Sequence, residues 1–261
     1  MAPAAVHDPA VASALREYVQ AIADDEFILG HRHSEWTGFG PDIESDVALS
    51  SIAQEEIGHA RLFYQHLMAL AGRSEEDLDV VVFDRPPGEF RSAVLLERPN
   101  GDWGFSLVRL VLYELADAVR LDVLSRSPLE GLPDLARTLQ REEKYHRLYG
   151  ETWLVRLARA TADSRAHVQR ALDQAWAEAP GLFEPTSGEA RLLEAGLLAE
   201  SAARQQERWR QRVVDLLDPL HLRVPDAAPP WGGRRGEHSS DLAPLLDEMT
   251  AVRRVEAGAR W

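Results

Sequence analysis

Two short segments of the sequence place a histidine three residues after a glutamate. They are Glu56–His59 and Glu143–His146. Because an α-helix has about 3.6 residues per turn, positions i and i+3 share one face, and a carboxylate and an imidazole placed there can bind one metal ion together. Chance alone yields about one such spacing in a chain of this composition, so the two copies suggest a metal site without proving it.

An isolated glutamate precedes each of these segments by a similar distance. Glu26 lies 30 residues before Glu56, and Glu114 lies 29 residues before Glu143. Both Glu26 and Glu114 occur in apolar stretches, where a carboxylate is costly unless it is paired or bound to metal. Dimetal helical bundles take one Glu from each of two helices and a Glu-x-x-His from each of the other two. The sequence therefore predicts these metal ligands: Glu26, Glu56, His59, Glu114, Glu143 and His146.

The predicted ligands are carboxylate oxygens and imidazole nitrogens, and the chain contains no cysteine. This set favours two iron ions, leaves manganese possible, and argues against magnesium and calcium. The lack of cysteine excludes disulfides, zinc–thiolate sites, iron–sulfur clusters and thiol catalysis. The alternative is that Glu56, Glu143 and their neighbours form solvated helix faces with ion pairs such as Glu143–Arg147.

Other charged residues near these segments are predicted to play lesser roles. Glu55 and Glu142 lie four residues before the histidines, and we expect them to face solvent, because the Glu-x-x-His spacing favours the glutamate that follows each. Asp24 and Asp25 are expected on a plain helix surface, with orientation of a ligand histidine as the alternative. Asp117, one turn after a predicted ligand, is a better candidate for that supporting role.

Some further residues could do chemistry but have plain structural alternatives. His31 and His33 are two residues apart, which points them in different directions on a helix, so we do not expect them to share an ion. Tyr145 and Tyr149 are expected to be packed core tyrosines. The glycine- and arginine-rich residues 232–236 fit either a phosphate cradle or a flexible tail.

The elements that must position these residues are helices. Apolar spacing and Gly or Pro breaks predict helices over 10–33, 42–72, 103–126, 133–160, 164–178, 187–217 and 241–256. Residues 73–105 form a predicted long crossover connection with an extended piece at 80–83, and 219–240 a predicted loop. The chain is therefore predicted to be all-α, a ferritin-like four-helix bundle with additional C-terminal helices. We expect one domain over 1–261, with a core bundle at 10–160, C-terminal helices at 164–217 and a tail at 219–261.

Charge and local patterns exclude several classes of function. The chain of 261 residues has a formal net charge of −14, which argues against non-specific nucleic-acid binding. It has neither a signal peptide nor a run of about 18 apolar residues, so we expect no membrane span and a cytoplasmic location. No glycine-rich fingerprint of a flavin, nicotinamide or ATP site is present.

Several longer segments resemble the phenylacetyl-coenzyme A oxygenase (epoxidase) family of bacterial ring-oxidising proteins. They cover nearly the whole length: 30–36, 41–46, 53–61, 97–103, 142–146 and 236–261. The length, the Pro99–Gly101 segment and the C-terminal tail are most similar to the C subunit, usually called structural, which pairs with the catalytic A subunit. In C subunits of the family the metal-ligand positions are largely lost, whereas the six predicted ligands here match the pattern of the catalytic subunit.

The resemblance implies a carboxylate-bridged diiron site that activates O₂ to oxidise an aromatic or acyl-CoA thioester in phenylacetate catabolism. It implies a homo- or hetero-oligomer with a paired oxygenase subunit, an external reductase and a small coupling protein. The alternative is a non-catalytic structural subunit that docks and stabilises the catalytic oxygenase subunit. A ferritin- or rubrerythrin-like peroxidase or iron store is disfavoured by the missing cysteines and the long C-terminal half.

Overall fold

The computed structural model describes residues 4–74, 78–226 and 231–255, and within these ranges every regular element is a helix. The α-helices are α1 Pro9–Ser34, α2 Ile43–Leu70, α3 Leu78–Phe83, α4 Val94–Glu97, α5 Trp103–Leu124, α6 Leu132–Ala160, α7 Ala162–Trp176, α8 Glu189–Glu194, α9 Ala202–Leu217, α10 Leu242–Met249 and α11 Ala251–Val255. Short 3₁₀ turns occur at Ala4–His7, Pro87–Glu89, Ala179–Phe183, Asp218–Leu220 and Gly233–Arg235. The all-α prediction is confirmed.

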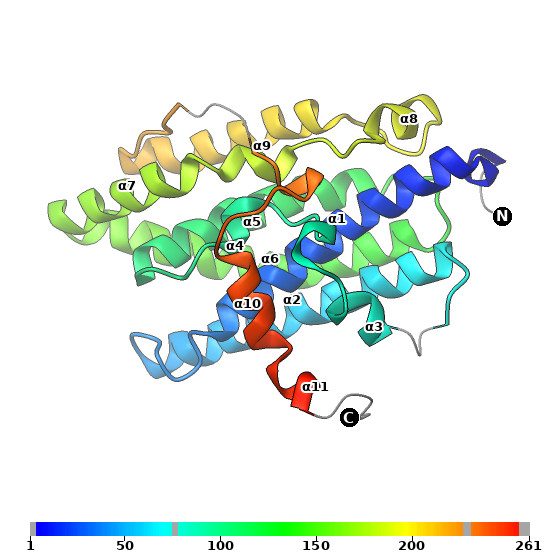
Figure 1. Cartoon of the computed structure of the whole chain (residues 1–261). Helices are drawn as coiled ribbons and strands as arrows, with labels where there is room; N and C mark the ends of the chain where they lie inside the picture. Colours follow the sequence, from blue (N-terminus) through cyan, green and yellow to red (C-terminus); the bar gives the residue numbers. More distant parts are fainter. Residues whose placement is uncertain (1–3, 75–77, 227–230, 256–261) are drawn as a thin grey trace.

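The four long helices form two hairpins. α1 packs chiefly on α2, and α5 packs chiefly on α6 (Figure 1). Both second members begin where the sequence predicts: the Asp42 carboxylate accepts a hydrogen bond from the backbone N–H of Ser45 at 2.7 Å and caps α2, and α6 begins after Gly131, whose φ is 83°. The crossover between the hairpins carries α3 and α4. This is the ferritin-like arrangement that the sequence predicts.

The first helix of each hairpin is the buried one. Nearly every residue of α5 and of the second half of α1 is buried. The C-terminal helices α7 and α9 pack on α5, and they lie together along one side of the bundle (Figure 1). Between them the indoles of Trp176 and Trp209 stack at 4.9 Å, and Trp209 Nε1 donates to the carbonyl of Leu112 at 2.9 Å. α2 and α6 keep exposed faces.

Asp24 and Asp25 are fully buried, so the expectation of a plain helix surface is wrong. Asp25 accepts hydrogen bonds from Arg120 Nη2 at 3.0 Å, from Arg234 Nη2 at 2.6 Å and from a backbone N–H of the crossover. Asp24 accepts from Arg85 Nη2 at 2.7 Å. Neither carboxylate orients a ligand histidine. They are buried because α1 is covered on all sides, and arginines from distant segments balance their charge.

The loop at 232–236 holds the C-terminal segment onto the bundle. Arg234 is 4% exposed, and besides Asp25 it donates to the carbonyls of Ala21 at 3.2 Å and Leu182 at 3.0 Å. Gly233 lies so close to the crossover that a Cβ there would meet the carbonyl oxygen of Ser92 at 2.0 Å. Both interpretations of this loop, the phosphate cradle and the flexible tail, are therefore wrong.

Residues 80–83 are helical rather than extended, as part of α3. Their β-branched side chains favour a strand, but tertiary packing overrides this weak preference. Val82 is buried, and the ring of Phe83 packs edge-on against Phe27 with centroids 5.5 Å apart. This one short helix therefore closes over α1.

The predicted helices at 187–217 and 241–256 are each divided in two. Gly196 adopts a left-handed φ of 68° after α8, and Ser201 begins α9 by accepting a hydrogen bond from the N–H of Arg204 at 3.3 Å. The C-terminal segment divides at Thr250, between α10 and α11. Residue 256 lies outside the described residues.

Gly30 allows α1 to approach α2 closely, and this gives a testable prediction. A Cβ at Gly30 would lie 2.8 Å from Ile57 Cγ1 and 3.2 Å from the Ala53 carbonyl oxygen. We expect Gly30→Ala to destabilise the protein, because overpacking costs about 1–3 kcal/mol and outweighs the gain of about 1 kcal/mol from a better helix former. Denaturant unfolding checks this. The matched control is Gly58→Ala, where a Cβ meets nothing within 4 Å and stability should rise; equal shifts would contradict the packing argument.

Candidate metal centre

The four long helices bring the predicted ligand residues together inside the bundle, and none of them is more than 2% exposed. They form two sets of three, and in each set the ligand atoms lie within 4.8 Å of one another. The sets are Glu26, His59 and Glu143, and Glu56, Glu114 and His146. Each set draws on three helices and combines a Glu-x-x-His glutamate from one hairpin with the histidine of the other.

Glu143 lies between the two sets. Its Oε1 is 2.8 Å from His59 Nδ1, and its Oε2 is 3.3 Å from His146 Nδ1. The two imidazoles are nearly parallel, with centroids 6.0 Å apart and an interplanar angle of 23°. One carboxylate that presents a different oxygen to each histidine has the geometry of a bridge between two ions.

The glutamates of the two buried helices occupy matching positions. Glu26 Oε2 lies 3.7 Å from His59 Nδ1, and Glu114 Oε1 lies 3.6 Å from His146 Nδ1. The repeat of about thirty residues in the sequence therefore becomes an approximate twofold repeat in space. The match is not complete, because Tyr113 donates a hydrogen bond of 2.8 Å to Glu26 Oε1.

The polar atoms of the cluster fit a pair of cations. Both oxygens of Glu56, Glu114 and Glu143, and Nδ1 of His59 and His146, have no hydrogen-bond partner among the described residues. Such buried, unpaired atoms are costly in the absence of a ligand. They lie close together without the alignment of hydrogen bonds, as atoms directed at a shared ion do. Two divalent ions would also balance the charge of four carboxylates.

The cluster strongly perturbs its own protonation. Burial, followed by repulsion from Glu26, raises the pKa of Glu56, and burial followed by Glu143 raises that of Glu114. Burial also acts to raise the pKa of Glu143, but contact with His146 and His59 outweighs it and lowers the pKa. Burial opposes the charging of His59 and His146, yet contact with Glu143 raises their pKa values to about 12 and about 9.

These shifts predict that metal binding releases protons. At pH 7 the metal-free cluster holds protons on both histidines and on carboxyls with raised pKa values, and ions displace them. Calorimetric titration with Mn²⁺ in buffers of different ionisation enthalpy should show about two or more protons released per chain, and metal affinity should fall as the pH is lowered. Titration without proton release would contradict the assignment of these protonation states.

The same shifts predict how the stability of the metal-free protein depends on pH. The pKa values of Glu56, Glu114 and His146 are raised in the folded state, so the stabilisation is complete below the unfolded values. It is lost as the pH rises through the folded values, which for His146 is about 9.

Glu55 and Glu142 are exposed, as predicted, but they also contact the ligand histidines. Glu142 Oε2 lies 2.8 Å from His59 Nε2, and Glu55 Oε2 lies 2.8 Å from His146 Nε2. We did not predict these contacts because each joins one hairpin to the other. The repeated signal in the sequence is a second glutamate just before each Glu-x-x-His segment.

The other candidates stand apart from the two sets. Asp117 is buried beside Arg120 at 3.4 Å and makes no described hydrogen bond to a ligand histidine, so its expected supporting contact is not seen. His33 is fully buried with its Nδ1 3.5 Å from Glu56 Oε1, and burial followed by Arg109 lowers its pKa, which keeps it neutral. His31 packs edge-on against Phe27.

The two tyrosines that flank His146 in sequence differ in exposure. Tyr145 is 67% exposed, so the expectation of a packed core tyrosine is wrong for it. Tyr149 is half-buried and packs against the cluster around Leu49 and Leu110. Neither tyrosine contacts the ligand sets among the described interactions.

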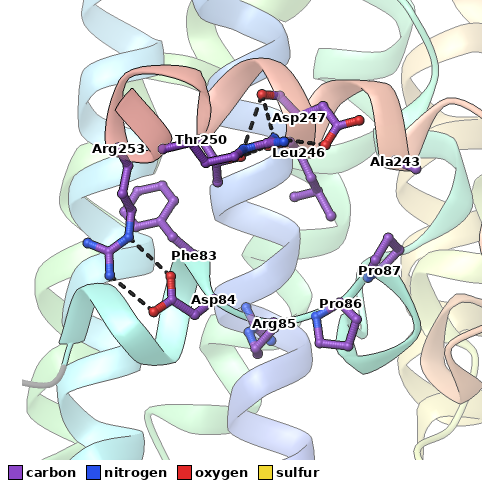
Figure 2. Close-up of a pocket in the computed structure, with 11 residues that line it drawn as sticks. Phe83, Asp84, Arg85, Pro86, Pro87, Ala243, Leu246, Asp247, Thr250 and Arg253 are labelled. Atoms are coloured by element: carbon purple, nitrogen blue, oxygen red, sulfur yellow. Dashed lines mark hydrogen bonds and ion pairs between the residues drawn. The ribbon is translucent and has the colours of Figure 1, made fainter. Parts of the chain in front are cut away.

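A cavity of about 660 Å³ lies between residues 83–87 and the C-terminal helices, as Figure 2 shows. Its arginines are already paired: Arg253 Nε lies 3.1 Å from Asp84, and Arg85 is turned inward to Asp24. None of the predicted metal ligands lines this cavity. It therefore provides neither free cations for an anionic ligand nor a described path to the metal centre.

Comparison with known proteins places the whole chain in one context. Residues 1–261 match the family model described as "Phenylacetic acid catabolic protein". The chain is 29% identical over 248 residues to the C subunit of the 1,2-phenylacetyl-CoA epoxidase of Escherichia coli (strain K12), a match that covers 95% of this chain and 99% of that relative. None of the described helices is both long and apolar enough to cross a membrane.

Proposed function

This chain belongs to the phenylacetic acid catabolic protein family, and on that premise we propose that it is a diiron-containing component of a multicomponent phenylacetyl-CoA-type oxygenase. The observation that carries the proposal is the pair of buried ligand sets, whose carboxylate oxygens and imidazole nitrogens have no hydrogen-bond partner among the described residues. A subunit that serves only as a scaffold has no need for this costly arrangement.

The ligand sets define which residues would hold each ion. Glu26 and His59 belong to one ion and Glu114 and His146 to the other, with Glu143 between them. Bound there, a pair of iron or manganese ions supplies the O₂ activation that no amino-acid side chain provides.

The chain's own residues hold and shield these ligands. The buried helices α1 and α5 exclude water from the cluster, and the Tyr113 hydroxyl fixes one oxygen of Glu26. Removal of water strengthens the attraction between the carboxylates and the cations.

The proposed substrate and partners follow from the relative. That protein is named as part of an epoxidase for 1,2-phenylacetyl-CoA, and we extend an aryl or acyl-CoA thioester substrate to this chain. The sequence carries no fingerprint of an electron-carrying cofactor. We therefore propose a paired oxygenase subunit, an external reductase and a small coupling protein as partners.

A second candidate function is a non-catalytic subunit that docks and stabilises a catalytic partner. It is favoured by the similarity to the C subunit of the epoxidase. The two candidates differ in one respect that can be measured, because only the first requires the ligand residues of this chain for turnover.

The experiment is turnover of phenylacetyl-CoA by the assembled complex, with O₂ and the reductase, after expression in iron-supplemented medium. A complex that contains the Glu114→Gln variant of this chain should assemble but lose O₂-dependent oxidation of the thioester. The control variant is Arg253→Ala, on the surface far from the ligand sets. If the Glu114→Gln complex turns over at the wild-type rate, this chain is the scaffold and the catalytic proposal is wrong.

A further inference from the structure

Each ligand histidine presents its two ring nitrogens to different carboxylates. His59 turns Nδ1 toward Glu143, 2.8 Å away, and Nε2 toward Glu142, also 2.8 Å away. His146 repeats the arrangement, with Nδ1 3.3 Å from Glu143 and Nε2 2.8 Å from Glu55. A neutral imidazole has one N–H and one lone pair. A carboxylate that accepts from Nε2–H therefore selects the tautomer whose Nδ1 lone pair faces the cluster.

The two outer contacts cross between the hairpins. His59 on α2 meets a glutamate of α6, and His146 on α6 meets a glutamate of α2. α2 packs chiefly on α1, and α6 packs chiefly on α5. The two crossed contacts therefore join the outer helices of the bundle beside the ligand sets, and a change in either one moves a ligand histidine directly.

The positions of Glu55 and Glu142 are unlike those of ordinary surface glutamates. Their side chains are 47% and 48% exposed, whereas the histidine side chains they meet are 2–3% exposed. Among the described residues, each has a ligand histidine as its only ion-pair or hydrogen-bond partner, although arginines are common on the surface. Adjacent residues of a helix point about 100° apart. In each Glu-Glu-x-x-His segment the second glutamate therefore faces the cluster while the first faces the opposite helix.

We propose that Glu55 and Glu142 are positioning residues of the metal centre, each of which holds the ligand histidine of the opposite hairpin in its metal-binding tautomer and orientation. This assignment rests on the metal centre proposed above. It divides the labour between the two residues: Glu142 acts on the ion bound by His59, and Glu55 acts on the ion bound by His146. Neither residue is itself a ligand.

Co²⁺ titration tests the assignment, because the visible absorption of bound Co²⁺ reports the ligands and geometry of each site. Wild-type protein should bind two Co²⁺ ions tightly. Glu142→Ala and Glu55→Ala should each retain one tight ion and bind the other about 10–100-fold more weakly, the range typical of partners of a ligand histidine. The double variant should bind both weakly. The conservative Glu142→Gln and Glu55→Gln, which keep an acceptor oxygen, should restore part of the loss.

The control is Glu44→Ala, an exposed glutamate in the first turn of α2 that meets no ligand histidine among the described contacts. It should bind Co²⁺ like the wild type, with the same spectrum, and far-UV circular dichroism should show all variants folded. Wild-type affinity and spectrum in both alanine variants would overturn the assignment, as would an equal loss in Glu44→Ala. A wild-type protein that binds no Co²⁺ would overturn the metal centre itself and this assignment with it.

Discussion

Replacement of Glu143 with glutamine is expected to abolish tight binding of both metal ions, whereas replacement of Glu26 is expected to abolish tight binding of one. Glu143 presents Oε1 to His59 and Oε2 to His146, so both ligand sets depend on its two oxygens. Glu26 faces His59 only among the ligand histidines. A glutamine keeps the size of the side chain, but it loses the negative charge and replaces one acceptor oxygen with an N–H₂ donor.

Calorimetric titration with Mn²⁺ measures this difference. The loss of affinity at each affected site should exceed the range of about 10–100-fold typical of a supporting residue. Glu44→Gln serves as the control, because Glu44 is exposed and makes no described contact with the cluster. If Glu143→Gln retains one tight ion, as Glu26→Gln should, Glu143 belongs to a single ion and the bridging geometry is wrong.

The largest expected effect on stability comes from Asp25. Its buried carboxylate accepts hydrogen bonds from Arg120 and Arg234, so Asp25→Ala leaves two buried guanidinium groups without their counter-charge. Removal of one partner from a buried ion pair costs about 3–5 kcal/mol. Urea unfolding of the metal-free protein measures the loss without a contribution from metal ligation.

Two further variants test the electrostatic reason for this loss. Asp84→Ala removes an exposed carboxylate paired with Arg253, and it should cost about 0–1 kcal/mol. Asp25→Ala/Arg234→Met removes one stranded cation together with the anion, and it should recover part of the lost stability. If Asp25→Ala costs no more than Asp84→Ala, the buried network does not hold the C-terminal segment and α1 together.

Spacing along single helices made most of the fold predictable. The starts of α2 and α9 follow capping residues, Asp42 and Ser201, and four long helices agree with their predicted ranges within about two residues. The six candidate ligands were found because their pattern is local: i and i+3 within a helix, and a repeat of about thirty residues within a hairpin. A four-helix bundle converts such local patterns into proximity with little further information.

Contacts between distant segments were not predictable in the same way. Asp25 is buried because Arg234, more than two hundred residues later, reaches it through a loop that fitted a phosphate cradle equally well. Glu55 and Glu142 were expected to face solvent because the partner of each lies on the other hairpin. In α3, edge-on packing of Phe83 against Phe27 outweighed a run of β-branched residues.

The metal content of the purified protein tests the central claim most directly. Wild-type protein expressed in iron-supplemented medium should contain about two irons per chain, the number that two sets of three buried ligands predict. The Glu56→Ala/His146→Ala variant should fold but lose that iron. A folded wild-type protein that contains no more iron than this variant would contradict the metal centre and leave a structural subunit as the function of this chain.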